Sequence, residues 1–524
     1  MASSSSPPPP QRTYDDALSR LAHLQSNRTI VNLFGNDDSQ HKPGPKKDLN
    51  SLAIPEMLSW LARAGYTPSS LAATGLKCVH VAGTKGKGSV SALVSSIISQ
   101  YPSTSGPTVG TYTSPHVLSV RERIQLDCVP ISREKFAKYF FEVWDRLSQA
   151  AREAKDPVSC DDEYEGPGTK PFYFRFLTIL AFHVFVREGV KSAVIECGIG
   201  GEYDSTNFLA PESVTASVVT QLGIDHVAML GDTVEKIAWN KSGIFRRGVK
   251  AFTRRLDGET QRGVMEVLRD RTAEKGAEKL VEVEDKEVEK WKGVGLEGAR
   301  LEGPFQKYNM ALAVAAAREH LIKTGHKFEG TFGEEGWKLD DIPVEFVKGL
   351  KEASLKGRYE SFEDSKGTRW FVDGAHTEDS LAGVGQWFAG KVKGDENEVN
   401  VLVFNQQDRD PEVLLRALLT AAQKQSGRAT PVFSYAVFTR NEEKAPVEGE
   451  PERDLAVQLK GQKIVHEASA GIETSVYNAV ELAMEQVQKI AEQARKEGKT
   501  CNFLVTGSFH LLGGVLKTVE YVEY

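Results

Sequence analysis

A glycine- and lysine-rich segment of this 524-residue chain has the composition of a phosphate-binding turn. The apolar run Lys77–Ala82 leads into it, and a pattern of apolar residues at helical spacing follows from Val90 to Ile98. Between a strand and a helix, glycines let the backbone approach phosphate oxygens, and the first amides of the helix point at the anion. Lys87 would then supply positive charge to the outer phosphates. The residues expected to bind phosphate are Gly83, Thr84, Lys85, Gly86, Lys87, Gly88 and Ser89.

The spacing of this segment differs from the usual phosphate loop. The first glycine of the usual pattern would fall at Val81, and Gly88 separates Lys87 from Ser89. The alternative is an ordinary strand-to-helix turn with incidental lysines. Three glycines and Lys87 within the six residues 83–88 favour phosphate binding over that alternative.

Two polar positions follow apolar runs and could hold a metal ion. Glu196 comes directly after Ala193–Ile195 and precedes a glycine-rich stretch, and Asp225-His226 follows the run Ser217–Leu222. Ligands of open α/β sheets gather at the carboxyl ends of the strands, and Mg²⁺ prefers oxygen ligands. We therefore expect Glu196 and His226 at matching positions near a metal ion. The alternatives are a helix-capping or salt-bridged glutamate and a structural histidine.

Lys241 is a candidate for amine chemistry. Val234, Ile237 and Ala238 mark the apolar face of a predicted helix, and Lys241 falls on that face, seven residues after Val234. Burial disfavours the charged ammonium, so an inward-facing lysine has a lowered pKa. Its neutral amine could react with CO2 and present carbamate oxygens to a metal ion. The alternative, which the periodicity alone favours, is a lysine that extends its charge to solvent.

Apolar runs typical of buried strands alternate with helical patterns along the chain. The predicted strands are Lys77–Ala82, Ser192–Cys197, Ser217–Leu222, Trp370–Val372, Val399–Asn405, Val432–Phe438 and Asn502–Thr506. Continuous apolar strands separated by helices predict parallel sheets covered on both faces, and hence an α/β fold. Because four of these strands follow residue 360, we expect a second α/β domain with its own sheet.

The expected domain organisation is a disordered tail at residues 1–11, a large domain at 12–350 and a smaller domain at 351–524. The tail contains Ser3–Ser6 and Pro7–Pro10 and has no apolar core for secretion. Arg12 is soon followed by Asp15 and Asp16, which is poor for a transit peptide. We therefore expect a cytoplasmic protein, and a mitochondrial isoform stays open.

Composition narrows the function classes further. Hydrophobic residues make up 40% and charged residues 26%, which is ordinary for a globular protein and excludes a wholly disordered chain. The net charge of −7 gives no global basic field, so no nucleic-acid partner is expected. The five cysteines form no CxxC pair, which argues against a zinc cluster and suits a reducing compartment. No apolar run reaches the roughly 18 residues of a membrane helix.

These motifs carry a family resemblance. The chain resembles the folylpolyglutamate synthases, which are members of the Mur-ligase superfamily of ATP-dependent amide ligases, from about Arg12 to its C-terminus. The matching motifs are Val81–Ser89, Thr113–His116 with Val120–Ile124, Phe172–Phe176, Glu196–Gly201 with Asp204–Asn207, Leu222–His226, Gly231–Ala238 with Lys241, Phe371–His376 and Val505–His510. The Gly83–Ser89 form is similar to eukaryotic members, and Thr13–Ala17 is similar to fungal ones.

The resemblance implies a fold and a set of ligands. The implied fold is an N-terminal, P-loop-containing ATPase domain of Mur-ligase type with a parallel sheet, followed by a smaller C-terminal Rossmann-like α/β domain. The implied cofactors are ATP and two Mg²⁺ ions, with K⁺ as a candidate monovalent cation. The implied metal ligands are Ser114 and Glu196 for one ion, and Glu196, His226 and a carbamylated Lys241 for the other.

The resemblance also assigns nucleotide contacts to both domains. Lys87 and Ser89 would lie in the ATP phosphate loop, and Asn309 would contact the nucleotide from the first domain. From the second domain, Arg358 would approach the phosphates, Asp373 the ribose, and His376 the nucleotide.

The implied enzyme is a ligase that forms carbon–nitrogen bonds. It would add L-glutamate to the γ-carboxylate of tetrahydrofolate or its polyglutamates, through an acyl phosphate, with ADP and phosphate as by-products. The implied partners are the small molecules tetrahydrofolate, L-glutamate and ATP, and a monomer is expected. The nearest alternative is dihydrofolate synthase, which joins glutamate to dihydropteroate; the Thr113–Arg123 and Phe172–Phe176 motifs favour the polyglutamating enzyme. A bifunctional protein, a P-loop NTPase acting as a switch, and an interaction protein with a degenerate ligase fold are further alternatives.

Overall fold

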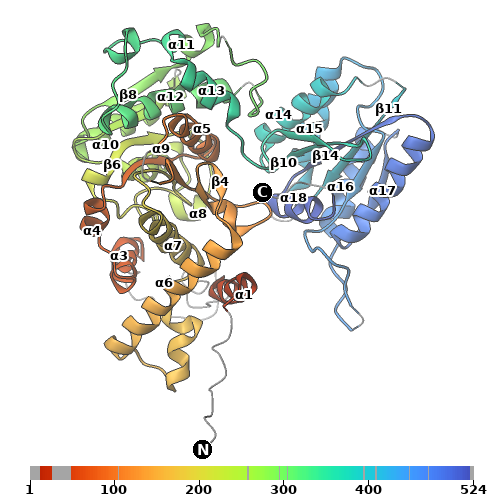
Figure 1. The fold of residues 1–524 in the computed structure, drawn as a ribbon. Helices are drawn as coiled ribbons and strands as arrows, with labels where there is room; N and C mark the ends of the chain where they lie inside the picture. The colour runs from red at the N-terminus through yellow and green to blue at the C-terminus, as the bar shows by residue number, and fades with distance from the viewer. Residues whose placement is uncertain are drawn as a thin grey trace, which may run out of the picture. The chain divides into compact units, whose positions relative to one another are not determined.

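The chain folds into two compact units (Figure 1). The computed structural model describes residues 12–25, 49–103, 106–256, 259–293, 295–303, 305–393, 396–406, 410–447, 449–469 and 471–519. The first unit draws its described residues from Met1–His116, Val120–Gly298 and Lys307–Ala353, and the second from Val117–Ser119, Ala299–Gln306 and Ser354–Tyr524. Two short segments that precede residue 350, Val117–Ser119 and Ala299–Gln306, therefore belong to the second unit. The expected tail, residues 1–11, lies outside the described residues.

The first unit is built on an eight-stranded sheet. Its strands are β1 (Lys77–Ala82), β2 (Val109–Tyr112), β3 (Ile124–Leu126), β4 (Val129–Pro130), β5 (Ser192–Glu196), β6 (Val214–Val219), β7 (Lys250–Arg255) and β8 (Leu280–Glu284). The order is β4-β3-β2-β5-β1-β6-β7-β8. The pairs β2–β3 and β3–β4 at one edge are antiparallel, and the other pairs are parallel. The sheet is thus parallel over its centre, as the apolar strands predicted, with an antiparallel edge that the sequence did not indicate.

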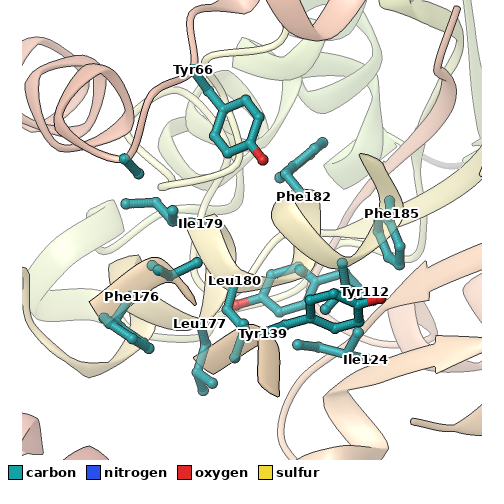
Figure 2. Close-up of a cluster of buried hydrophobic side chains, with 14 of the residues drawn as sticks. Tyr66, Tyr112, Ile124, Tyr139, Phe176, Leu177, Ile179, Leu180, Phe182 and Phe185 are labelled. Atoms are coloured by element: carbon teal, nitrogen blue, oxygen red, sulfur yellow. The ribbon is translucent and has the colours of Figure 1, made fainter. Parts of the chain in front are cut away.

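The helices of the first unit pack on this sheet or on one another. They are α1 (Tyr14–Gln25), α3 (Ala53–Arg63), α4 (Pro68–Ala73), α5 (Lys87–Ser99), α6 (Arg133–Ala154), α7 (Tyr173–Arg187), α8 (Val227–Leu230), α9 (Val234–Lys241), α10 (Glu259–Glu274), α11 (Asp285–Lys290), α12 (Gln306–Lys323) and α13 (Val344–Glu352). Figure 2 draws part of the main core, in which Phe176, Phe182 and Phe185 of α7 are gathered with Tyr112 of β2 and Tyr139 of α6. Because α7 is apolar on nearly every face, it is buried as a core helix.

The second unit has a six-stranded sheet of its own. Its strands are β9 (Glu360–Glu363), β10 (Arg369–Asp373), β11 (Glu398–Phe404), β12 (Tyr435–Phe438), β13 (Glu473–Val476) and β14 (Thr500–Thr506), in the order β13-β12-β11-β14-β10-β9. Only β9 is antiparallel to its neighbour among these strands. Its helices are α14 (Glu378–Lys391), α15 (Pro411–Ser426), α16 (Ala456–Ala468), α17 (Val480–Lys496) and α18 (Phe509–Leu516).

Two apolar clusters separate the helices of this unit into layers. α14, α15 and α16 pack on one face of the sheet, whereas α17 and α18 pack on the other. This arrangement, with parallel strands covered on both faces, confirms the predicted α/β class. No helix in the described parts of the chain is both long enough and apolar enough to cross a membrane.

Candidate active site

The predicted phosphate-binding turn lies between β1 and α5. β1 ends at Ala82 and α5 begins at Lys87, with Gly86 as its N-cap, so the predicted strand–turn–helix context is confirmed. Gly83 and Gly86 have φ angles of 151° and 88°, and residues that carry a Cβ rarely adopt such backbone conformations. The amides at the start of α5 are therefore presented at the end of the turn, where an anion would be stabilised.

The segment after β6 holds this turn in place. The Gln221 carbonyl accepts hydrogen bonds from the amides of Thr84 (2.9 Å) and Lys85 (3.1 Å). The Thr220 hydroxyl donates to the Lys85 carbonyl at 2.7 Å. Sequence reasoning missed Thr220 and Gln221. The signal that could have found them is their place directly after a strand, because β6 is a neighbour of β1.

The side chains of Lys87 and Lys241 converge on one backbone oxygen. Lys87 Nζ donates to the Gly83 carbonyl at 3.1 Å, and Lys241 Nζ donates to the same oxygen at 2.8 Å. Lys241 is only 2% exposed, in agreement with its predicted place on the apolar face of α9. Burial, with the charge of Lys87 as a further cause, lowers the pKa of Lys241 to about 7. The turn thus has two converging amino groups, and Lys87 is the one that suits a polyanion.

Glu196 lies beside this turn at the same edge of the sheet. It is the last residue of β5 and is buried, and it is paired with Val81 of β1 in the sheet register. Its Oε2 accepts a hydrogen bond from the Ser114 amide at 3.2 Å. β2, which precedes Ser114, also pairs with β5. The carboxyl ends of three neighbouring strands therefore bring Ser114, Glu196 and Gly83 to one place.

His226 does not occupy the predicted position. β6 ends at Val219, three residues before the end of the predicted strand, so the residues 220–225 separate His226 from the sheet. His226 is instead the N-cap of α8, with a φ of 47° and a side chain that is 45% exposed. Its Nε2 lies 3.5 Å from Asp225 Oδ2. The matching of His226 with Glu196 at two strand ends was wrong, because the strand begins and ends earlier than its apolar pattern indicated.

Asn309 lies directly against the phosphate-binding turn. It is a buried residue near the start of α12. A Cβ added at Gly86 would come within 2.6 Å of Asn309 Oδ1, so the side chain is in contact with the turn. The structure therefore brings Asn309 together with the turn.

The residues assigned to the second domain lie at the end of β10. Asp373, the last residue of that strand, is buried, and its Oδ2 and Oδ1 accept hydrogen bonds from the amides of Tyr359 (2.9 Å) and Ala375 (2.8 Å). Burial raises the pKa of Asp373 to about 6, against the opposing charge of Arg358. His376 follows in the same loop. The second unit thus gathers Arg358, Asp373 and His376 at one edge of its own sheet.

Comparison with known proteins decides the family. The chain is 37% identical to a folylpolyglutamate synthase of Neurospora crassa over an alignment 543 positions long, which covers 100% of this chain and 93% of the relative. It is also 37% identical to the folylpolyglutamate synthase of a Saccharomyces cerevisiae strain, over 98% of this chain and 88% of the relative. The chain belongs to the folylpolyglutamate synthase family. The predicted resemblance, including the likeness to fungal members, is confirmed.

The fold of the folylpolyglutamate synthases agrees with this assignment. A Mycobacterium tuberculosis folylpolyglutamate synthase, solved in complex with ADP and AMPPCP, matches with a TM-score of 0.64 at 23% identity, over 91% of this chain and 99% of that one. This likeness confirms the predicted Mur-ligase-type fold with two α/β parts. No family model matches the chain.

The oxygen ligands at this edge fit the Mg²⁺ ion that the synthase family implies. Among the residues that the structure describes, no three His, Cys, Asp or Glu side chains gather as a metal site. Mg²⁺, however, usually keeps several waters and is held by one or two carboxylates together with substrate phosphates. Glu196 offers carboxylate oxygens beside the phosphate-binding turn, and Ser114, whose backbone amide donates to Glu196, offers a hydroxyl. This donor set suits an ion that binds together with a nucleotide.

Proposed function

We propose that the chain catalyses the ATP-dependent addition of L-glutamate to the γ-carboxylate of tetrahydrofolate and its polyglutamates. The observation that carries the proposal is the convergence of Lys87 and Lys241 on the Gly83 carbonyl beside Glu196, in a member of the folylpolyglutamate synthase family. The Mycobacterium tuberculosis synthase of the same fold binds ADP and AMPPCP, which supports ATP as the nucleotide.

The reaction must turn a poor acyl donor into a good one. A carboxylate oxygen of the folate attacks the γ-phosphorus of ATP, and the bond between that phosphorus and the bridging oxygen breaks. ADP leaves, and the folate carboxylate has become an acyl phosphate. The glutamate amine then attacks the acyl carbon, the nitrogen loses a proton, and phosphate leaves as the amide forms. The main tasks of the protein are to position these groups and to neutralise their charge.

The residues of the first unit suit these tasks. We assign the amides of Gly83–Ser89 and the ammonium of Lys87 to the phosphates of ATP, and Asn309 to the nucleotide. Ser114 and Glu196 would hold one Mg²⁺ ion. Glu196 and Lys241 would hold the second together with His226, which follows Asp225, a residue whose charge acts on Lys241. When bound, Mg²⁺ neutralises phosphate charge. In the second unit, we assign Arg358, Asp373 and His376 to the nucleotide.

We further propose that Lys241 acts as a carbamate. Its buried amine has a pKa of about 7, so near neutral pH much of it is uncharged and nucleophilic. The nitrogen lone pair attacks the carbon of CO2, and one proton is released to solvent, which leaves a carbamate anion. The change would replace the partly protonated amine by a carbamate, whose single negative charge is shared by two oxygens that can face a metal ion.

The proposed activity is tested by mass spectrometry of the products. Purified protein is incubated with ATP, Mg²⁺ and L-glutamate, with tetrahydrofolate in one reaction and dihydropteroate in another. We expect a ladder of added glutamyl residues on tetrahydrofolate. Product from dihydropteroate alone would move the assignment to dihydrofolate synthase, and ATP hydrolysis without either product would favour a nucleotide-dependent switch.

Asp373→Ala is expected to raise the KM for ATP by roughly tenfold, the cost of a hydrogen bond to a charged acceptor. Because the pKa of Asp373 is about 6, the carboxylate that accepts from the ribose prevails above that pH. The KM for ATP should therefore rise as the pH falls below 6, and Asp373→Asn should show a smaller change with pH. Steady-state kinetics from pH 5 to 8 measure both effects. An unchanged KM in Asp373→Ala removes this residue from the nucleotide site.

We also propose a cytoplasmic monomer. All five cysteines are free thiols, which suits a reducing compartment. Light scattering of the purified protein gives its mass in solution, and a dimer would contradict the proposed state.

A further inference from the structure

The loop that follows Glu196 is fixed at its start by Asp204. The buried Asp204 carboxylate accepts hydrogen bonds from the amides of Gly198 (2.9 Å) and Ile199 (3.1 Å). Thr206 donates to the same carboxylate through its amide (2.9 Å) and its hydroxyl (2.6 Å). The first part of the loop is therefore tied to a buried charge.

The far end of the loop lies on α9, the helix that ends at Lys241. Asn240 Oδ1 accepts a hydrogen bond from the Gly201 amide at 3.0 Å, and the Asn240 carbonyl accepts one from the Glu202 amide at 2.7 Å. A Cβ added at Gly201 would lie 2.5 Å from the Lys241 carbonyl oxygen, so the backbones of the loop and the helix are in direct contact. One short loop thus connects Glu196 with Lys241, and Asn240 is the residue that joins its end to the helix.

Removing the Asn240 carboxamide would loosen this junction. Asn240 is buried, so without its Oδ1 the Gly201 amide would lose its acceptor in a place away from water. An unpaired buried amide is unfavourable, and the loop would be expected to shift toward another acceptor or toward solvent. Because Lys241 directly follows Asn240, such a shift changes the separation between Lys241 and Glu196.

We propose that Asn240 is a positioning residue whose carboxamide sets the separation between Glu196 and Lys241. The inference rests on the proposed function, which assigns both of these side chains to a Mg²⁺ ion. Groups that orient metal ligands typically change metal affinity or activity by roughly 10-fold to 100-fold when they are removed. Asn240 would act in this way without touching the ion itself.

Metal binding tests this role directly. Asn240→Ala removes the acceptor, and Asn240→Asp retains one. We expect Asn240→Ala to weaken the binding of Mn²⁺, measured by electron paramagnetic resonance in the presence of ADP, by roughly tenfold or more. The Mg²⁺ concentration for half-maximal turnover should rise by a similar factor, whereas Asn240→Asp should recover most of the Mn²⁺ binding. At saturating Mg²⁺, the KM for ATP should stay nearly unchanged, because Thr220 and Gln221 hold the phosphate-binding turn independently.

Asn400→Ala is the matched control. Asn400 is a buried asparagine of the second unit that accepts a hydrogen bond from Asn502 Nδ2 (2.8 Å) and donates one to the Val432 carbonyl (2.9 Å). We expect this change to lower the melting temperature without altering Mn²⁺ binding. Should Asn240→Ala not fold, Asn240→Gln, which moves the carboxamide by one methylene group, is expected to weaken Mn²⁺ binding as well.

Two results would overturn the inference. One is unchanged Mn²⁺ binding in the Asn240 variants that lose or displace the acceptor, and the other is an equal loss in Asn400→Ala. Failure of the proposed function gives a different result. In that case the wild-type protein forms no glutamylated product. Mn²⁺ binding in the presence of ADP can still be measured, so the effect of the Asn240 variants on metal binding is tested separately.

Discussion

Lys241→Ala is expected to lower the rate of glutamate addition by about a hundredfold or more, the usual cost of removing a charged group that acts on reacting oxygens. The side chain is buried, donates to the Gly83 carbonyl and would carry the carbamate that faces the metal ion. ADP affinity should change little, because Lys87 and the turn amides remain. Product formation and calorimetric titration with ADP measure the two effects separately. Near-normal kinetics would refute the role of Lys241.

Lys170→Ala is a matched control for this substitution. Lys170 is likewise 2% exposed, and burial lowers its pKa to about 8. Its Nζ donates to the Tyr164 carbonyl at 2.9 Å and to the Thr169 hydroxyl at 2.8 Å, both in the segment between α6 and α7. We expect Lys170→Ala to lower the melting temperature and to keep normal turnover per folded molecule.

Lys241→Arg separates the carbamate from the positive charge. A guanidinium stays protonated and cannot form the carbamate, so the variant should be nearly inactive although the charge is kept. In ¹³C NMR with labelled bicarbonate, we expect a carbamate signal in the wild-type protein that is absent from Lys241→Arg. An active Lys241→Arg variant would exclude the carbamate as a requirement.

The parts of the site that the sequence predicted are those that local pattern controls. β1 has the predicted bounds because its apolar run is continuous and Gly83 follows it directly. Glu196 ends β5 for the same reason. Lys241 lies on the predicted apolar face of α9, since the helix begins at the apolar position from which the spacing was counted. Its burial, which the periodicity alone did not favour, is shown by the folded protein. In each case the strand or helix period determined the position of the functional side chain.

The strand before His226 was misplaced because β6 contains buried polar residues. Thr215 donates through its hydroxyl to the Cys78 carbonyl at 3.1 Å, and Ser217 donates to the Ile244 carbonyl at 3.1 Å. Because Thr215 and Ser217 interrupt the apolar residues, the start of the strand has no continuous apolar pattern in the sequence. The hydrogen bonds that allow these hydroxyls to be buried exist only in the folded protein. The prediction consequently moved the strand toward His226.

The strands β7 and β8 were missed because of their charged ends. Arg254 and Arg255 at the end of β7 pair with Asp285 and with Glu284 at the end of β8. In a sequence, runs of charged residues are typical of segments exposed to solvent. Here the charges at the ends of β7 and β8 form ion pairs with one another at the edge of the sheet. The roles of Thr220 and Asn240 were hidden for a related reason, because each depends on a hydrogen bond between segments far apart in the chain.

Gly83→Ala is expected to weaken ADP binding by about a hundredfold and to lower the melting temperature, since strain in a disfavoured φ region alone costs roughly 1–3 kcal/mol. Gly83 has a φ of 151°, and a Cβ there would overlap Thr220 Oγ1 and lie 2.9 Å from Thr220 Cβ. Thr220 cannot move aside easily, because its amide donates to the Ala82 carbonyl (2.8 Å) and its hydroxyl to the Lys85 carbonyl (2.7 Å). The turn must shift instead, and it would carry with it the carbonyl that both lysines share.

Gly223→Ala and the double variant Gly83→Ala/Thr220→Gly test whether this overlap is the cause. Gly223 lies in the same segment as Thr220, but a Cβ there would meet only Thr84 Cγ2, at 3.9 Å, so ADP binding should stay normal. In the double variant the Thr220 side-chain atoms that crowd the new Cβ are gone, although the hydrogen bond from Thr220 to Lys85 is lost as well. Its loss of ADP affinity should therefore be smaller than the sum of the losses in Gly83→Ala and in Thr220→Gly alone. Calorimetric titration with ADP and thermal unfolding measure all of these variants. Wild-type affinity in Gly83→Ala, or a loss in the double variant equal to that sum, would show that the close approach of Gly83 to Thr220 does not control the shape of the phosphate-binding turn.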